Sequence, residues 1–203
     1  MVNHAHMAGG CLLIDGFTPG EASLSGLFAA LERSGMASKR FASTGEPLRE
    51  ELLRAYWDVR SPFDASSIAA VGTGCWAALA LAEQLPVDRL ALVFPPADRS
   101  FPHVSPPLRR QLLRMLGFAR RNLPLCVADT IAVLAPGDEP APWLKRLPDL
   151  REYVFRLKDS VSAGATVEKR TDFGMETAIS RFLRTGELPK SLAEISEMCI
   201  MYG

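Results

Sequence analysis

The chain has 203 residues, 23 basic and 23 acidic side chains, and therefore a formal net charge of zero. This length is typical of one domain, and a hydrophobic content of 48% is enough to build a core, which argues against a disordered chain. Zero net charge argues against nucleic acid or an anionic membrane surface as a partner, because both attract a basic excess. His4 and His6 lie near the N-terminus, so His103 is the one histidine within the body of the chain.

Short apolar runs that predict strands alternate with longer segments of helical periodicity. The predicted strands cover residues 11–14, 37–42, 67–71, 89–94, 130–135 and 165–170. The predicted helices cover residues 23–34, 47–59, 75–84, 108–121, 147–162 and 175–184, and residues 187–203 form a helical tail that we expect to pack on the body. This alternation predicts a single domain over residues 1–203 with an α/β fold, a three-layer sandwich of about six mostly parallel strands with helices on both faces.

The four cysteines predict neither a metal site nor a redox centre. They lie far apart, and none has the Cys-x-x-Cys spacing of zinc sites and thioredoxin-like proteins, so we expect reduced and mostly buried thiols. No segment approaches the ~18 continuous apolar residues of a membrane span, and residues 1–10 lack the basic region of a signal peptide. We therefore expect a cytoplasmic protein with no cofactor and no bound metal.

Three of the predicted strands end in unusual residues, and sites in open parallel sheets form at such ends. Residues 12–20 read Leu-Leu-Ile-Asp-Gly-Phe-Thr-Pro-Gly, residues 70–80 read Ala-Val-Gly-Thr-Gly-Cys-Trp-Ala-Ala-Leu-Ala, and residues 131–140 read Ile-Ala-Val-Leu-Ala-Pro-Gly-Asp-Glu-Pro. In this order, these segments resemble the α/β-hydrolase superfamily, especially its small lidless esterase- and thioesterase-like members. The resemblance covers about residues 10–185 and implies that fold without a large lid.

Residues 70–80 resemble the nucleophile elbow, in which a strand turns sharply into a helix around Gly-x-Ser-x-Gly. Aligned without gaps, the nucleophile position falls on Gly74, which has no side chain. Shifted by one residue, it falls on Cys75, which is a competent nucleophile type at a helix N-terminus. Trp76 would then either fill the acyl position or offer the acyl group an apolar wall.

The resemblance also assigns residues to the oxyanion hole. Phe17 and Thr18 match the loop that supplies one of its amides, and Asp15 stands where the family usually has histidine. Two interpretations of Asp15 stay open: it hydrogen-bonds neighbouring loop amides, or it lies in the pocket and binds a ligand. In the second case it could form a carboxylate pair with Asp138 or Glu139.

The acid and the base of a catalytic triad have unequal support. Asp138 or Glu139 matches the triad acid, but residues 171–175, where the resemblance places the histidine, read Thr-Asp-Phe-Gly-Met and contain no histidine. Asp172 of this loop is a candidate residue of the pocket region, together with Gly74 and Trp76. His103 follows the fourth predicted strand and is the remaining candidate base, although a solvated surface histidine is the more common use of such a residue.

A Ser-His-Asp mechanism therefore lacks both its nucleophile and its base. The sequence favours a degenerate, non-catalytic or barely active relative of small esterases that acts as a binding or scaffolding protein. The alternative is a carboxylester or thioester hydrolase that uses Cys75 as its nucleophile. The expected ligand is a small acyl or ester compound, and a homo-oligomer is compatible with the sequence.

Overall fold

The computed structural model describes residues 9–17, 23–42, 48–60, 66–96, 127–134, 144, 150–154 and 173–188. Within these residues, strands and helices follow in the order β1 (Gly10–Ile14), α1 (Ser25–Arg33), β2 (Ser38–Phe41), α2 (Leu48–Arg60), β3 (Ser66–Val71), α3 (Gly74–Ala82), β4 (Val87–Val93), β5 (Val127–Leu134), β6 (Leu150–Val154) and α5 (Phe173–Thr185). The predicted helix 108–121, the predicted strand 165–170 and the predicted tail after residue 188 lie outside the described residues.

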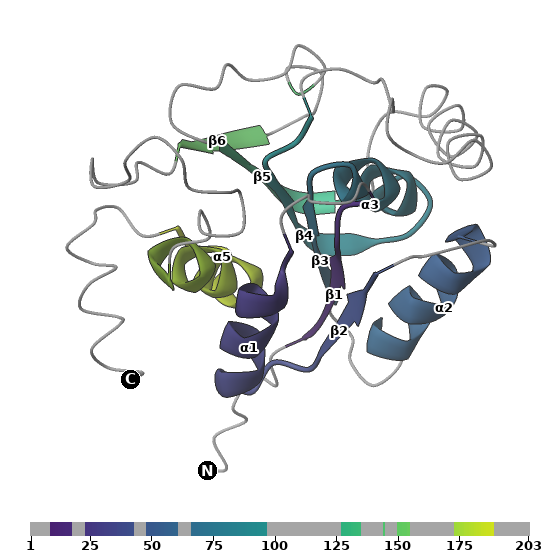
Figure 1. Ribbon diagram of the computed structural model, residues 1–203, viewed down its shortest axis with the longest axis horizontal. Coiled ribbons are helices and arrows are strands. Elements are labelled where there is room, and N and C mark those ends of the chain that lie inside the picture. Colours follow the sequence, from purple (N-terminus) through teal and green to yellow (C-terminus); the bar gives the residue numbers. More distant parts are fainter. Residues whose placement is uncertain are drawn as a thin grey trace.

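The strands form one sheet in the order β2-β1-β3-β4-β5-β6, and every neighbouring pair is parallel (Figure 1). The chain leaves β1 toward β2 on one side and then continues from β3 toward β6 on the other. The order of the strands therefore reverses between β1 and β3, and their carboxyl ends mark the topological switch point where open α/β sheets build their sites.

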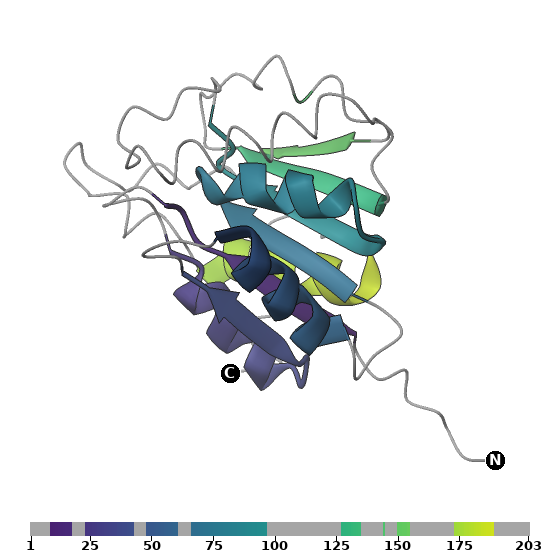
Figure 2. The same ribbon diagram turned by 90° about the vertical axis from the view of Figure 1, so that its right-hand side faces the viewer.

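Helices cover both faces of the sheet, as Figure 1 and Figure 2 show. Alternate residues of β1 point to opposite faces: Leu12 and Ile14 pack in the apolar cluster beneath α2 and α3, whereas Cys11 and Leu13 pack in the cluster beneath α1 and α5. Both faces of the strand are apolar because both are buried, as is usual in a parallel sheet. The predicted three-layer α/β sandwich is confirmed.

Helix α3 is unlike the other helices because it is apolar on every side. Each residue from Gly74 to Ala82 is buried, so its Ala- and Leu-rich sequence reflects a helix enclosed by the core rather than one with a solvated face. No helix among the residues that the structure describes combines the length and apolarity needed to cross a membrane.

One predicted element is wrong. The periodicity predicts a helix over residues 147–162, but Leu150–Val154 forms β6, which pairs in parallel with β5. A strand at this place satisfies backbone donors and acceptors along the outer edge of β5, which a helix cannot do. The adjacent Tyr153 and Val154 are also residue types that favour strands. The structure thus has six strands within the described residues, with residues 150–154 as the sixth.

Glu83 follows the last residue of α3, where the helix dipole disfavours a negative charge. Partial burial raises the pKa of its carboxyl to about 7 from the ordinary value of 4.5. As the pH rises from 4.5 toward 7, the unfolded chain loses this proton before the folded chain does. The folded state is therefore destabilised across that interval, and the loss is complete above it.

We expect Glu83→Gln to raise the melting temperature at pH 8 and to leave it nearly unchanged at pH 4.5, because the amide carries no charge to desolvate. Glu51→Gln is the matched control, since Glu51 is exposed in the first turn of α2 and its charge favours that helix N-terminus. The control variant should lose a little stability at pH 8. Thermal unfolding at the two pH values measures both variants, and an equal gain for Glu83→Gln at both would contradict the prediction.

Candidate functional site

The chain turns sharply from β3 into α3 at Gly72. This residue has a φ of 54°, in the left-handed region that favours glycine. Its amide donates to the carbonyl of Val93 in β4 at 3.0 Å, and its carbonyl accepts from the amide of Cys75 at 3.1 Å. Gly72 therefore hydrogen-bonds through its amide to the sheet and through its carbonyl to the first turn of the helix.

Gly72 occupies the apex of the turn, which corrects the prediction that Gly74 or Cys75 does. The next residues are already in or at the helix, because α3 begins at Gly74 and Thr73 is its N-cap with a φ of −64°. Residues 70–74 thus align with the five positions of Gly-x-Ser-x-Gly, and Gly72 falls on the third of them.

Gly74 brings the start of α3 into direct contact with the end of β1. A Cβ atom at this position would lie 2.5 Å from the carbonyl oxygen of Asp15 and 2.8 Å from that of Ile14. No real Cβ atom approaches a backbone oxygen so closely. Glycine is needed here for packing, and it brings the turn after β3 against the strand end that carries Asp15.

Cys75 lies beneath the turn and not on its surface. Its side chain is completely buried, and its Sγ donates to the carbonyl oxygens of Ala70 at 3.4 Å and Val93 at 3.7 Å. Trp76 is 1% exposed and packs in the apolar cluster beneath α2 and α3. Cys11 is also buried and outside any disulfide, and burial raises its pKa well above the usual range.

A hydrogen bond joins the loop after β1 to the turn after β3. The amide of Phe17 donates to Oγ1 of Thr73 at 2.8 Å, across 56 residues of sequence, and both residues are buried. Thr73 is the N-cap of α3, but its side chain makes no hydrogen bond to the amides of its own helix. The hydroxyl oxygen therefore accepts from the neighbouring loop instead of capping the helix.

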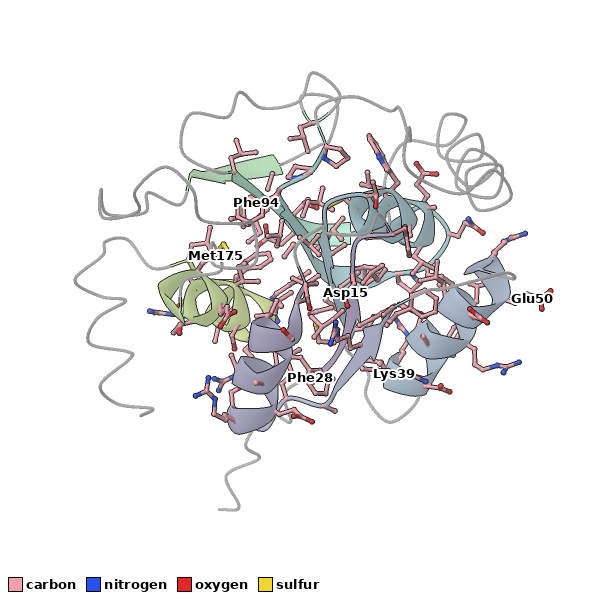
Figure 3. All side chains as sticks on the ribbon, viewed as in Figure 1. Asp15, Phe28, Lys39, Glu50, Phe94 and Met175 are labelled. Carbon is pink, nitrogen blue, oxygen red and sulfur yellow. The ribbon has the colours of Figure 1, made fainter. Side chains whose placement is uncertain are left out.

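Asp15 is buried at the carboxyl end of β1, near the centre of the view in Figure 3. Its Oδ1 accepts from the amide of Leu24 at 2.9 Å, and its Oδ2 accepts from Nε of Arg40 at 2.6 Å. Nη2 of the same arginine donates to Oγ of Ser23 at 2.9 Å. The carboxylate thus fixes the start of α1 and the end of β2, and it uses an oxygen for each.

Sequence reasoning missed Arg40, Gly72 and Thr73. The sequence did contain a signal for Arg40. This residue lies near the end of one predicted strand, and the preceding predicted strand is followed directly by an aspartate, so an ion pair between the two strand ends could have been predicted. The structure brings together Asp15, Phe17, Gly72, Thr73, Gly74 and Cys75 at the switch point. The other predicted site residues lie outside the described residues: Thr18, His103, Asp138, Glu139 and Asp172.

No cluster of three or more His, Cys, Asp or Glu side chains suited to a metal ion occurs in the described part of the chain. The polar groups at the switch point are one carboxylate, one guanidinium, two hydroxyls and backbone amides. Such groups can bind or orient an oxygen atom. Among the described residues, the Leu24 amide and Arg40 donate to Asp15, and the Phe17 amide donates to Thr73.

Comparison with known proteins gives structural similarity without sequence similarity. No protein-family model matches the chain, and no curated protein matches it. The NocB thioesterase domain, solved as a covalent complex with a fluorophosphonate nocardicin G analogue, has 17% identity and a TM-score of 0.51 over 88% of this chain and 95% of its own. A putative α/β-superfamily hydrolase from Xanthomonas campestris has 20% identity and a TM-score of 0.45 over 73% of this chain and 85% of its own.

An α/β hydrolase from Sphaerobacter thermophilus has 15% identity and a TM-score of 0.44, and the match covers 77% of this chain and 88% of its own. At such identities, similarity shows the fold alone. The chain has an α/β-hydrolase-like fold, as its three strand-end motifs predict.

The close contact at Gly74 predicts that adding one methyl group at this position lowers the stability of the protein strongly. Alanine at an exposed helical position would stabilise by about 1 kcal/mol relative to glycine, but the clash with two backbone oxygens outweighs this gain. We expect Gly74→Ala to lower the free energy of unfolding by roughly 3 kcal/mol. Denaturant unfolding provides the measurement.

Gly35→Ala is the control for Gly74→Ala. Gly35 has a φ of 73° with nothing within 4 Å of its Cβ position, so this variant reports backbone strain without a clash. It should cost about 1 kcal/mol. No loss of stability in Gly74→Ala would show that the close approach at Gly74 has no energetic weight.

The Asp15–Arg40 pair predicts unequal effects for two adjacent residues of β2. Arg40→Ala should cost about 1–3 kcal/mol of unfolding free energy, because it leaves a buried carboxylate short of its charged partner. Lys39→Ala should cost less than about 1 kcal/mol, since both members of the Lys39–Asp58 pair are about half exposed. Chemical denaturation of the two variants gives both values, and a loss from Lys39→Ala as large as that from Arg40→Ala would contradict the assignment.

Proposed function

We propose that this chain is a non-catalytic protein of the α/β-hydrolase fold, which forms no acyl-enzyme. Gly72 at the apex of the turn carries the proposal. In this fold the apex side chain attacks the substrate carbonyl, and the sharp turn exists to expose it. Glycine retains the turn and removes the attacking atom.

The burial of Cys75 weighs against the cysteine hydrolase alternative. A nucleophile must come within about 3–3.5 Å of the carbonyl carbon and within hydrogen-bond reach of a base. The Cys75 side chain is completely buried, and its sulfur donates to two strand carbonyls. Attack through this sulfur would require both contacts to break and the turn above it to open.

The histidine count supports the same proposal. The fold's triad histidine follows the last strand, and residues 155–172 between β6 and α5 contain no histidine. Without a histidine in that loop, a hydroxyl near the turn lacks the base that the triad uses to remove its proton. The predicted small acyl or ester ligand, the scaffolding role and the homo-oligomer stay predictions.

The experiment asks whether the full chain catalyses acyl transfer. The purified protein should neither be labelled by a fluorophosphonate probe nor hydrolyse 4-nitrophenyl acetate or an acyl thioester above a protein blank, while a serine esterase run alongside does both. Cys75→Ala should behave as the unmodified chain does. Saturable hydrolysis by the unmodified chain would overturn the proposal, and its loss in Cys75→Ala would establish the cysteine mechanism instead.

A further inference from the structure

The fold's enzymes stabilise the oxyanion with two backbone amides: that of the residue after the nucleophile, and one from the loop after the strand that here is β1. With Gly72 at the apex, the residue after it is Thr73, and Phe17 lies in the other loop. We propose that the Thr73 hydroxyl is a built-in occupant of the oxyanion position, which closes the Phe17 amide to any ligand carbonyl. This inference rests on the proposed function and explains why the oxyanion position beside the same turn does not accept a ligand carbonyl.

The geometry of the hydrogen bond supports occupation of the amide. The 2.8 Å between the Phe17 nitrogen and Thr73 Oγ1 is a normal, well-formed distance. A threonine at a helix N-cap usually accepts from an amide of its own first turn, and Thr73 makes no such bond. Its hydroxyl oxygen is instead placed where a substrate oxygen would approach the loop after β1.

Neighbouring contacts hold the donor and the acceptor together. Gly74 packs directly on the carbonyl oxygens of Ile14 and Asp15, which keeps the turn against the strand end. The Asp15 carboxylate anchors this strand end to the start of α1 and to Arg40. The bond between Phe17 and Thr73 thus spans two segments whose separation is fixed by other interactions.

The energetics favour a closed position. A buried amide without a partner costs about 1–3 kcal/mol, so the loop gains by using the hydroxyl. A ligand carbonyl could reach the Phe17 amide only by displacing this hydroxyl, and one hydrogen bond would then replace another. The amide therefore offers a ligand no net stabilisation, and restoring a nucleophile at residue 72 would not by itself restore acyl transfer.

The test uses a nucleophile that needs no base. Gly72→Cys is combined with Thr73→Val, which removes the hydroxyl at nearly constant volume, or with Thr73→Ser, which keeps it. With 4-nitrophenyl acetate, the thiolate sulfur bonds to the acetyl carbon, 4-nitrophenolate leaves, and the thiol proton passes to buffer. With iodoacetamide the same sulfur displaces iodide, a reaction that involves no oxyanion. Peptide mass spectrometry assigns both products to residue 72.

We expect the ratio of the acetylation rate to the alkylation rate to be at least about tenfold higher in Gly72→Cys/Thr73→Val than in Gly72→Cys and in Gly72→Cys/Thr73→Ser, because a freed oxyanion donor accelerates only acetylation. Equal ratios in the three proteins would overturn the inference. If Thr73→Val does not fold, Thr73→Ala replaces it with the same two outcomes. Because every protein compared carries the introduced cysteine, the result does not depend on whether the unmodified chain hydrolyses esters.

Discussion

The contact between the end of β1 and the start of α3 is the constraint on which the rest of the switch point depends. Gly74 lets the helix touch the carbonyl oxygens of Ile14 and Asp15, where any larger residue would hold the two segments apart. Because every residue of α3 is buried, close packing opposes a shift of the helix away from this contact. The positions of Gly72, Thr73 and Cys75 follow from it.

Polar groups buried by that contact must find partners within the chain. The Asp15 carboxylate has the Leu24 amide and Arg40, the Phe17 amide has the Thr73 hydroxyl, and the Cys75 thiol has two strand carbonyls. In an enzyme of this fold, some groups at the same edge are left for substrate and for the transition state. Here the Asp15, Phe17 and Cys75 groups hydrogen-bond to other parts of the chain, and this supports the proposal of a non-catalytic protein.

Fold and catalysis are separable in this architecture for a physical reason. The sharp turn needs a residue that tolerates a positive φ and a small neighbour where the helix meets β1, and glycine meets both needs without any chemistry. The similarity to a thioesterase domain therefore shows how this chain is built and not what it does. Side chains at a few positions decide the function.

The sequence by itself determined the strand and helix alternation, the parallel α/β sandwich and the resemblance carried by three strand ends, because periodicity and strand-end residues are local properties. It did not determine the apex of the turn, since Gly72, Thr73 and Gly74 are all small and only the backbone φ distinguishes them. It misassigned residues 150–154, because the need of β5 for an edge partner overrode the helical pattern.

Tertiary structure alone decided the pairing of Asp15 with Arg40. Register places Arg40 opposite Leu13, two residues before Asp15 and on the same side of β1, and no pattern in the sequence reports register between parallel strands. The bond from Phe17 to Thr73 likewise joins residues 56 positions apart. Such contacts depend on how the packed segments meet, so residue types could suggest the site but not whether it is open.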